Sequence, residues 1–237
     1  MEEGTLFWAP LPCDAFLTEE PRLQIPFGRW KDGLCQCLKY GVCHAHLWCS
    51  FLCPALQMAQ IASRTQLTCW GQPGPPPATR NTFYIVASVM GVYIVVSTLL
   101  SIVLAEEEAI YYRHFSYKHN AEQKRLVLVG CLAAAKAITS VFFTGWFVYA
   151  LCQTRQSIRK IYGIRPVFGS TGGCGCCCKN DEDDDDDDDG CCEDFCCALV
   201  CTSCTVAQLA RHTGDYETYP SVCCTETGHA PGAPLMV

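Results

Sequence analysis

Residues 81–105 read NTFYIVASVMGVYIVVSTLLSIVLA, and this stretch decides the fold class. It carries no charged residue over about 25 positions. A helix needs about 20 apolar residues to cross the hydrocarbon core of a bilayer. A buried helix of a soluble protein rarely reaches this length without a polar face. We therefore predict that residues 82–104 form a transmembrane helix.

A second apolar stretch covers residues 126–153, after a charged segment at 105–125 that we predict to be a polar loop. Lys136 is the only charged residue within it. A span over 126–151 would place Lys136 inside the bilayer at a cost of a few kcal/mol. A span over 137–153 leaves Lys136 at the interface, and we favour this shorter span or a tilted mixture. Small residues four apart favour close packing of the two helices as a hairpin: Gly130 with Ala134, and Ala133 with Ala137.

The composition agrees with a membrane protein and excludes some functions. Of the 237 residues, 50% are hydrophobic and 17% are charged, whereas soluble domains carry about 25% charged residues. The net charge of -7 comes from the acidic run at 181–189, which we expect to be a solvated insertion. Without a broad basic surface, we expect no nucleic-acid partner. No catalytic motif is present, so we expect no enzyme.

The 21 cysteines raise the question of redox compartment. The first residues, MEEGTLFWAP, lack the basic start and apolar core of a signal peptide, so we expect both termini in the reducing cytosol. Arg155, Arg159 and Lys160 follow the second span and favour the same orientation, although the 105–125 segment is also basic in part. We expect the plasma membrane rather than an internal membrane.

The flanking regions form two cysteine-rich halves, 29–71 and 154–213, which share an internal repeat. Its pattern is C-x3-C-x6-Q followed by Ile or Leu and Ala. The uncharged stretches that carry it, 47–63 and 195–210, would reach about 24 Å as helices. This is short of a full crossing, so we expect short interfacial helices, with four crossings as the alternative. We also expect the two repeats to pack together. Matched positions are Cys49, Cys53 and Gln60 in the first half, and Cys197, Cys201 and Gln208 in the second.

Three interpretations of these cysteines remain open. Thiolates suit Zn(II), Cd(II) or another soft divalent metal, although only Cys201-x2-Cys204 has a familiar zinc spacing. Juxtamembrane cysteines are also acceptors of S-acylation, and reduced cysteines often serve only to pack. Gln60 and Gln208 are expected to make hydrogen bonds, because a buried amide without a partner is costly. The tentative metal ligands are Cys49, Cys53, Cys197, Cys201 and Cys204.

Four short motifs in the two halves belong together. Their residues are Trp30, Gly33, Leu34 and Cys37; Cys53, Pro54 and Gln60; Arg155, Ile158, Arg159, Tyr162, Gly163 and Ile164; and Cys201, Cys204, Gln208 and Arg211. In these motifs the chain resembles the placenta-specific gene 8 family of cysteine-rich membrane proteins, which includes plant cadmium-resistance proteins, fruit-weight and cell-number regulators, and cornifelin. Ala55 departs from the family pattern, because it replaces the second cysteine of a Cys-Pro-Cys element.

The resemblance implies a homo-oligomer that affects heavy-metal or divalent-cation transport or tolerance. The alternative is a non-transporting, S-acylated membrane adaptor that regulates cell number or growth through protein partners. The expected fold is a mainly α membrane protein, in which a hairpin of two transmembrane helices is flanked by the cysteine-rich halves. The remaining segments are a disordered N-terminal tail at 1–28, a proline-rich linker at 72–81 and a disordered C-terminal tail at 214–237.

Overall fold

The computed structural model describes residues 26–36, 38–41, 44–114, 119–166, 191–219, 221–223 and 225–229. The acidic insertion at 181–189, most of the predicted N-terminal tail and the last residues of the chain lie outside this part. Within the described residues, every secondary-structure element is a helix, and the only β-type pairings are two isolated bridges.

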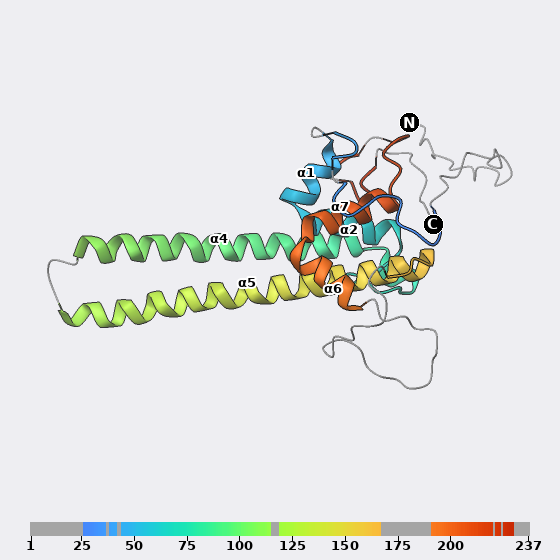
Figure 1. The fold of residues 1–237 in the computed structure, drawn as a ribbon. Coiled ribbons are helices and arrows are strands. Elements are labelled where there is room, and N and C mark those ends of the chain that lie inside the picture. Colours follow the sequence, from blue (N-terminus) through green and yellow to red (C-terminus); the bar gives the residue numbers. More distant parts are fainter. Residues whose placement is uncertain are drawn as a thin grey trace, which may run out of the picture.

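The described chain consists of a long helical stem and a compact head (Figure 1). The stem comprises residues 87–114 and 119–146, from the two longest helices, which lie side by side. The head comprises the shorter helices, the loops between them, the first residues of α4 and the last part of α5. The helices are α1 (Ala45–Leu52), α2 (Pro54–Arg64), α3 (Pro76–Thr79), α4 (Thr82–His114), α5 (His119–Tyr162), α6 (Cys191–Val200) and α7 (Thr202–Thr213).

The prediction of two long apolar helices is confirmed, since α4 and α5 are both long and apolar enough to cross a membrane. The predicted polar loop at 105–125 is wrong for most of its length. α4 continues to His114 and α5 already begins at His119. Glu, Ala, Gln and Lys are favourable in helices, so the charged residues end the apolar stretch without ending the helix.

The second apolar stretch is divided differently from the favoured prediction. Phe147, Ala150 and Leu151 are buried in the head, so residues 147–153 are not available as part of an exposed span. The exposed apolar part of α5 is residues 126–146, and it contains Lys136, which is half-buried. The longer alternative, with Lys136 inside the span, therefore fits the structure better.

The small residues of α5 do not mediate its packing on α4. Gly130, Ala133, Ala134 and Ala137 are all exposed, and a Cβ added at Gly130 would meet nothing within 4 Å. The two helices instead contact through larger side chains, as in the stacked rings of Tyr93 and Phe143, whose centroids lie 4.0 Å apart. The prediction that these small residues mediate the packing was therefore wrong.

The two repeats pack against each other in the head, as expected, because α1 and α2 both contact α7. The core is built from α2, α7, the base of α4 and the end of α5. Its fully buried side chains include Ile61, Val86, Leu151 and Leu209. A smaller cluster of Leu47 and Ala207, with Cys204 packed against it, joins α1 to α7.

Each repeat forms two helices rather than one, with a break at the second cysteine of the pattern. Cys53 separates α1 from α2, where Pro54 lacks the N–H that a continuous helix needs. Cys201 separates α6 from α7 without a proline. There, the Thr202 and Thr205 hydroxyls donate to the carbonyls of Ala198 and Cys197, and such bonds compete with the helical ones.

The proline-rich linker at 72–81 is more ordered than predicted. Pro76 begins the one-turn helix α3, since proline is tolerated in the first turn of a helix. Just before it, Gly71 has a φ of 77°, and an added Cβ would lie 2.4 Å from the Ala150 carbonyl oxygen. The Ser157 hydroxyl donates to the Gly71 carbonyl at 2.7 Å. This turn therefore presses directly on α5.

The predicted disorder of the C-terminal tail is wrong for residues 214–229 where they are described. Tyr216 and His229 are buried against α2, where both contact Arg64. Pro, Gly and Thr made this segment resemble a solvated tail in the sequence. Its aromatic residues nevertheless supply enough buried surface to hold it on the head.

Candidate functional site

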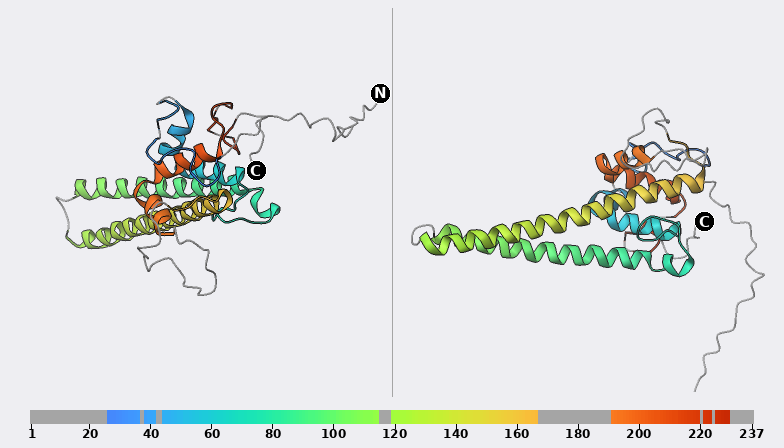
Figure 2. Two further views of the ribbon diagram at one scale, coloured as in Figure 1. Left: turned by 45° about the vertical axis from the view of Figure 1, so that its right-hand side comes forward. Right: turned by 90° about the horizontal axis from the view of Figure 1, so that it is seen from below.

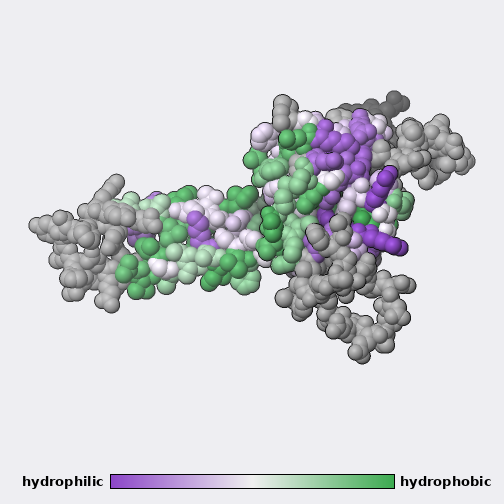
Figure 3. All heavy atoms as spheres, in the orientation of Figure 1, coloured by the Kyte–Doolittle hydropathy of each residue, from purple (hydrophilic) through white to green (hydrophobic). Residues whose placement is uncertain are grey.

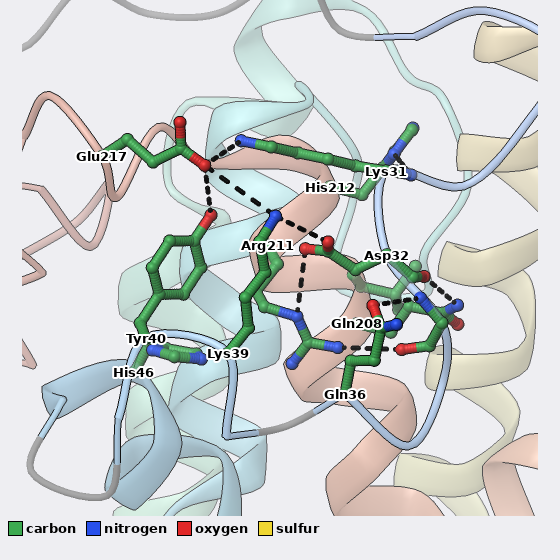
Figure 4. A network of polar contacts seen from close by, with 12 residues as sticks. Lys31, Asp32, Gln36, Lys39, Tyr40, His46, Gln208, Arg211, His212 and Glu217 are labelled. Atoms are coloured by element: carbon green, nitrogen blue, oxygen red, sulfur yellow. Dashed lines mark hydrogen bonds and ion pairs between the residues drawn. The ribbon is translucent and has the colours of Figure 1, made fainter.

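The predicted motif residues Gln208 and Arg211 lie at the polar centre of the head (Figure 4). Gln208 is buried on α7, and its amide joins three segments. Arg155 Nη1 on α5 donates to Gln208 Oε1 at 2.6 Å, and Gln208 Nε2 donates to the Asp32 carbonyl at 3.0 Å. One side chain thus holds α7, α5 and the segment before α1 in register.

Asp32 anchors that N-terminal segment. Its carboxylate accepts a hydrogen bond from Lys39 Nζ at 2.7 Å and lies 3.5 Å from Arg211 Nε. Arg211 is fully buried and also donates through Nη2 to the Gly33 carbonyl at 3.2 Å. The neighbouring Trp30 ring lies 4.5 Å from the Arg155 guanidinium carbon. The Trp-x2-Gly element therefore folds onto the arginines of α5 and α7.

Asp194 is the second buried carboxylate of this centre. It accepts from Arg155 Nε at 2.8 Å and from Arg159 Nη1 at 3.1 Å, and its side chain is fully buried. Glu193 Oε1 lies 3.5 Å from Arg155 Nη2. Burial raises the pKa of Asp194, while the positive charges of Arg159 and Arg155 act against that shift. These ion pairs fasten α6 to the end of α5.

Gln60, the counterpart of Gln208, performs a different task. Its Nε2 lies 2.8–3.2 Å from the carbonyl oxygens of Val222, Cys223 and Thr225, so it ties α2 to the C-terminal segment. Both glutamines are hydrogen-bonded, as predicted. Neither binds the opposite repeat. The contacts between the repeats are instead the packing of α1 and α2 on α7 and the hydrogen bond that Arg64 Nη2 on α2 donates to the Thr213 hydroxyl on α7 at 3.2 Å.

The head also contains three buried histidines, His46, His212 and His229. Burial is the main cause that lowers the pKa of each one. It lowers the pKa of His46 to about 3, with contributions from His44 and Arg211. It lowers the pKa of His212 and His229 to about 4, and Lys31 and Arg64, respectively, lower them further. All three are therefore neutral at physiological pH and suited to packing against aromatic rings, such as Tyr216 beside His46.

The tentative metal ligands are not gathered into one centre. Among the described residues, no group of three His, Cys, Asp or Glu side chains could hold a metal ion. Cys49 is buried and Cys204 packs between α1 and α7, whereas Cys197 and Cys201 are half-buried and Cys53 is exposed. Burial raises the pKa of the Cys197 thiol, which makes its thiolate harder to form.

Comparison with protein-family models, curated proteins and solved structures found no match. The resemblance to the placenta-specific gene 8 family therefore stays a prediction from the quoted motifs. What the structure adds is a role for several of those motif residues. Trp30, Arg155, Gln208 and Arg211 contact one another or share Asp32 as a partner.

The two buried acids, Asp32 and Asp194, and the C-terminal partners of Arg64 were not predicted from the sequence. Asp32 stands between the motif residues Trp30 and Gly33, and Glu193-Asp194 is a short acidic pair between two cysteine pairs in an otherwise uncharged stretch. An acidic residue in such surroundings predicts a buried ion pair, because an isolated buried charge requires a partner of opposite charge. The role of Tyr216 and His229 had no comparable signal in the sequence.

Proposed function

We propose that this chain is a two-pass membrane protein whose head lies on the cytosolic side and acts as a non-transporting adaptor. The observation that carries the proposal is the length of the exposed apolar stem. Residues 87–105 of α4 and 126–146 of α5 contain no buried residue and measure about 28 and 31 Å as helices. The hydrocarbon core of a bilayer is about 30 Å thick.

Charged residues border the apolar part of the stem at the end away from the head, where a membrane crossing would leave the bilayer. Glu106, Glu107 and Glu108 follow the apolar part of α4, and Lys124 and Arg125 precede that of α5. Arg155 and Arg159 lie on the head side, but basic residues stand at both ends of the spans, so the cysteines of the head are what favour a cytosolic orientation. The thiols of the head would then lie in a reducing compartment.

The architecture of the head favours an adaptor. Its charged centre consists of ion pairs and hydrogen bonds that join segments distant in the chain, such as Asp32 with Arg211. In the described residues, no metal-holding group lies near the spans. Two helices cannot enclose a pore, so one copy offers no path for an ion.

A homo-oligomer that moves divalent cations is the second candidate, and the motif residues Cys53, Pro54, Cys201 and Cys204 are its support. Purified protein reconstituted alone into proteoliposomes tests both candidates with Zn(II) and Cd(II). An adaptor gives no more uptake than protein-free vesicles, while vesicles with an ionophore confirm that the assay detects transport. Uptake that rises with the amount of protein would reject the adaptor proposal.

A further inference from the structure

The head carries two exposed apolar tips, one at each break between paired helices. The α1 tip consists of Phe51, Leu52 and the exposed Cys53, and the α6 tip consists of Leu199, Val200 and the half-buried Cys201. Leu52 and Val200 are 72% and 83% exposed, and Phe51 and Leu199 are also more than a third exposed. Two consecutive large apolar residues thus stand in the open immediately before each of the two cysteines.

The two tips share the same backbone geometry. Cys53 has φ and ψ of -134° and 59°, and Cys201 has -133° and 52°. Each cysteine occupies the N-cap position of the helix that runs back into the core. The bend therefore leaves the end of the preceding helix outside the core in both repeats, although the sequences FLC and LVC differ.

Both tips lie on the edge of the head from which the stem extends. The turn between α1 and α2 and the turn between α6 and α7 are found at this edge in two different views (Figures 1 and 2). Figure 3 shows the hydrophobic surface of the head concentrated there, while the hydrophilic surface lies on the side away from the stem.

The length of the stem indicates what covers this edge. The apolar parts of α4 and α5 each measure about one bilayer thickness. The buried core of the head includes Val86 and Phe147, and the partly buried side chains of Met90, Phe143 and Trp146 pack against it. No spacer separates the head from the bilayer. The edge that carries the tips is then level with the membrane surface, where apolar side chains gain from leaving water.

We propose that the two tips insert into the bilayer surface and that Cys53 and Cys201 are sites of S-acylation. The inference rests on the proposed function, since it requires α4 and α5 to cross the membrane. In the reaction, the cysteine thiolate attacks the thioester carbonyl of a long-chain acyl-CoA. A bond forms between the acyl carbon and Sγ, the bond to the CoA sulfur breaks, and CoA leaves with the proton that the cysteine lost.

Several other cysteines have different surroundings from these two positions. Cys196 on α6 is exposed, but buried Asp194 precedes Phe195 there, so no pair of exposed apolar residues stands before it. Cys49 is buried on α1, and Cys204 packs against Leu47 and Ala207. Cys35 is exposed, but it lies on the N-terminal segment that Asp32 fixes to Arg211, and no pair of exposed apolar residues precedes it. Cys35 is therefore the matched control.

The test is acyl exchange on the full-length protein expressed in eukaryotic cells. Free thiols are blocked, thioesters are cleaved with hydroxylamine, and each thiol released receives a mass tag. We expect C53S and C201S to lose one tag each, C53S/C201S to lose both, and C35S to keep the wild-type number. A double variant with the wild-type number of tags would overturn the proposal.

A second variant tests the apolar part of the tips without removing a thiol. L52S/V200S retains Cys53 and Cys201 but should lose both tags, because its tips no longer enter the bilayer surface. Full acylation of this variant would reject tip insertion. Glycosylation mapping of α4 and α5 tests the membrane crossing separately, so unchanged tags on a correctly inserted protein reject the acylation alone.

Discussion

Replacing Asp194 by alanine should strongly destabilise the head. The substitution removes the carboxylate that Arg155 Nε and Arg159 Nη1 contact at 2.8 and 3.1 Å, at a site with no solvent exposure. Removal of one partner from a buried ion pair costs about 3–5 kcal/mol. Glu193 remains 3.5 Å from Arg155 and compensates in part, so we expect a loss of about 3 kcal/mol.

Pulsed alkylation of Cys152 measures this loss, since Cys152 is buried in the head on α5. Protein in detergent micelles is titrated with urea, and the midpoint of Cys152 exposure is determined. With a urea dependence of about 2 kcal/mol/M, D194A should lower the midpoint by about 1.5 M. D194N should fall between D194A and wild type, and E226A, at an exposed position, should leave the midpoint unchanged. Equal midpoints for D194A and E226A would refute the reasoning.

Three further predictions concern the same head. Gln60→Ala should increase amide hydrogen exchange of residues 221–229, because this segment loses the amide group that contacts three of its carbonyls, whereas exposed Gln72→Ala should not. Gly71→Ala should lower the urea midpoint, because its φ is 77° and its Cβ would press on Ala150, whereas Gly91→Ala, which meets nothing within 4 Å, should not. The contribution of the buried histidines to the free energy of unfolding should be fully present above pH 6.5 and should fall as the pH is lowered towards 4. The reason is that unfolded histidines titrate near 6.5, while burial lowers the pKa of His212 and His229 to about 4 in the folded protein. His229→Gln should make that decline shallower, and an unchanged pH profile would contradict a contribution from His229.

The long apolar helices and the repeat were predictable because their signals are local in the sequence. The continuous hydrophobicity of residues 81–105 predicts a membrane-spanning helix without any knowledge of the segments that the helix contacts. The repeat pattern placed Cys53 and Cys201 at equivalent positions, and the structure gives them the same backbone conformation. Neither result depended on knowing which segments meet in space.

The candidate site was predicted less completely because its contacts are distant in the chain. Gln208 was singled out, but its partners Asp32 and Arg155 come from other segments, and no spacing rule connects them. The end of the second span was also misplaced. Phe147 and Leu151 are as apolar as lipid-facing residues, and only tertiary packing shows that they belong to the head core.

Glycosylation mapping tests the central claim, that α4 and α5 cross the membrane with the head on the cytosolic side. An acceptor sequence is placed near Ser116, between the two helices, or near Asp185, between α5 and α6. The account predicts modification of the first site in the endoplasmic reticulum lumen and none of the second. Modification near Asp185 alone would show that the head lies on the opposite side of the membrane and would contradict the account. Modification at both sites would contradict a two-pass topology.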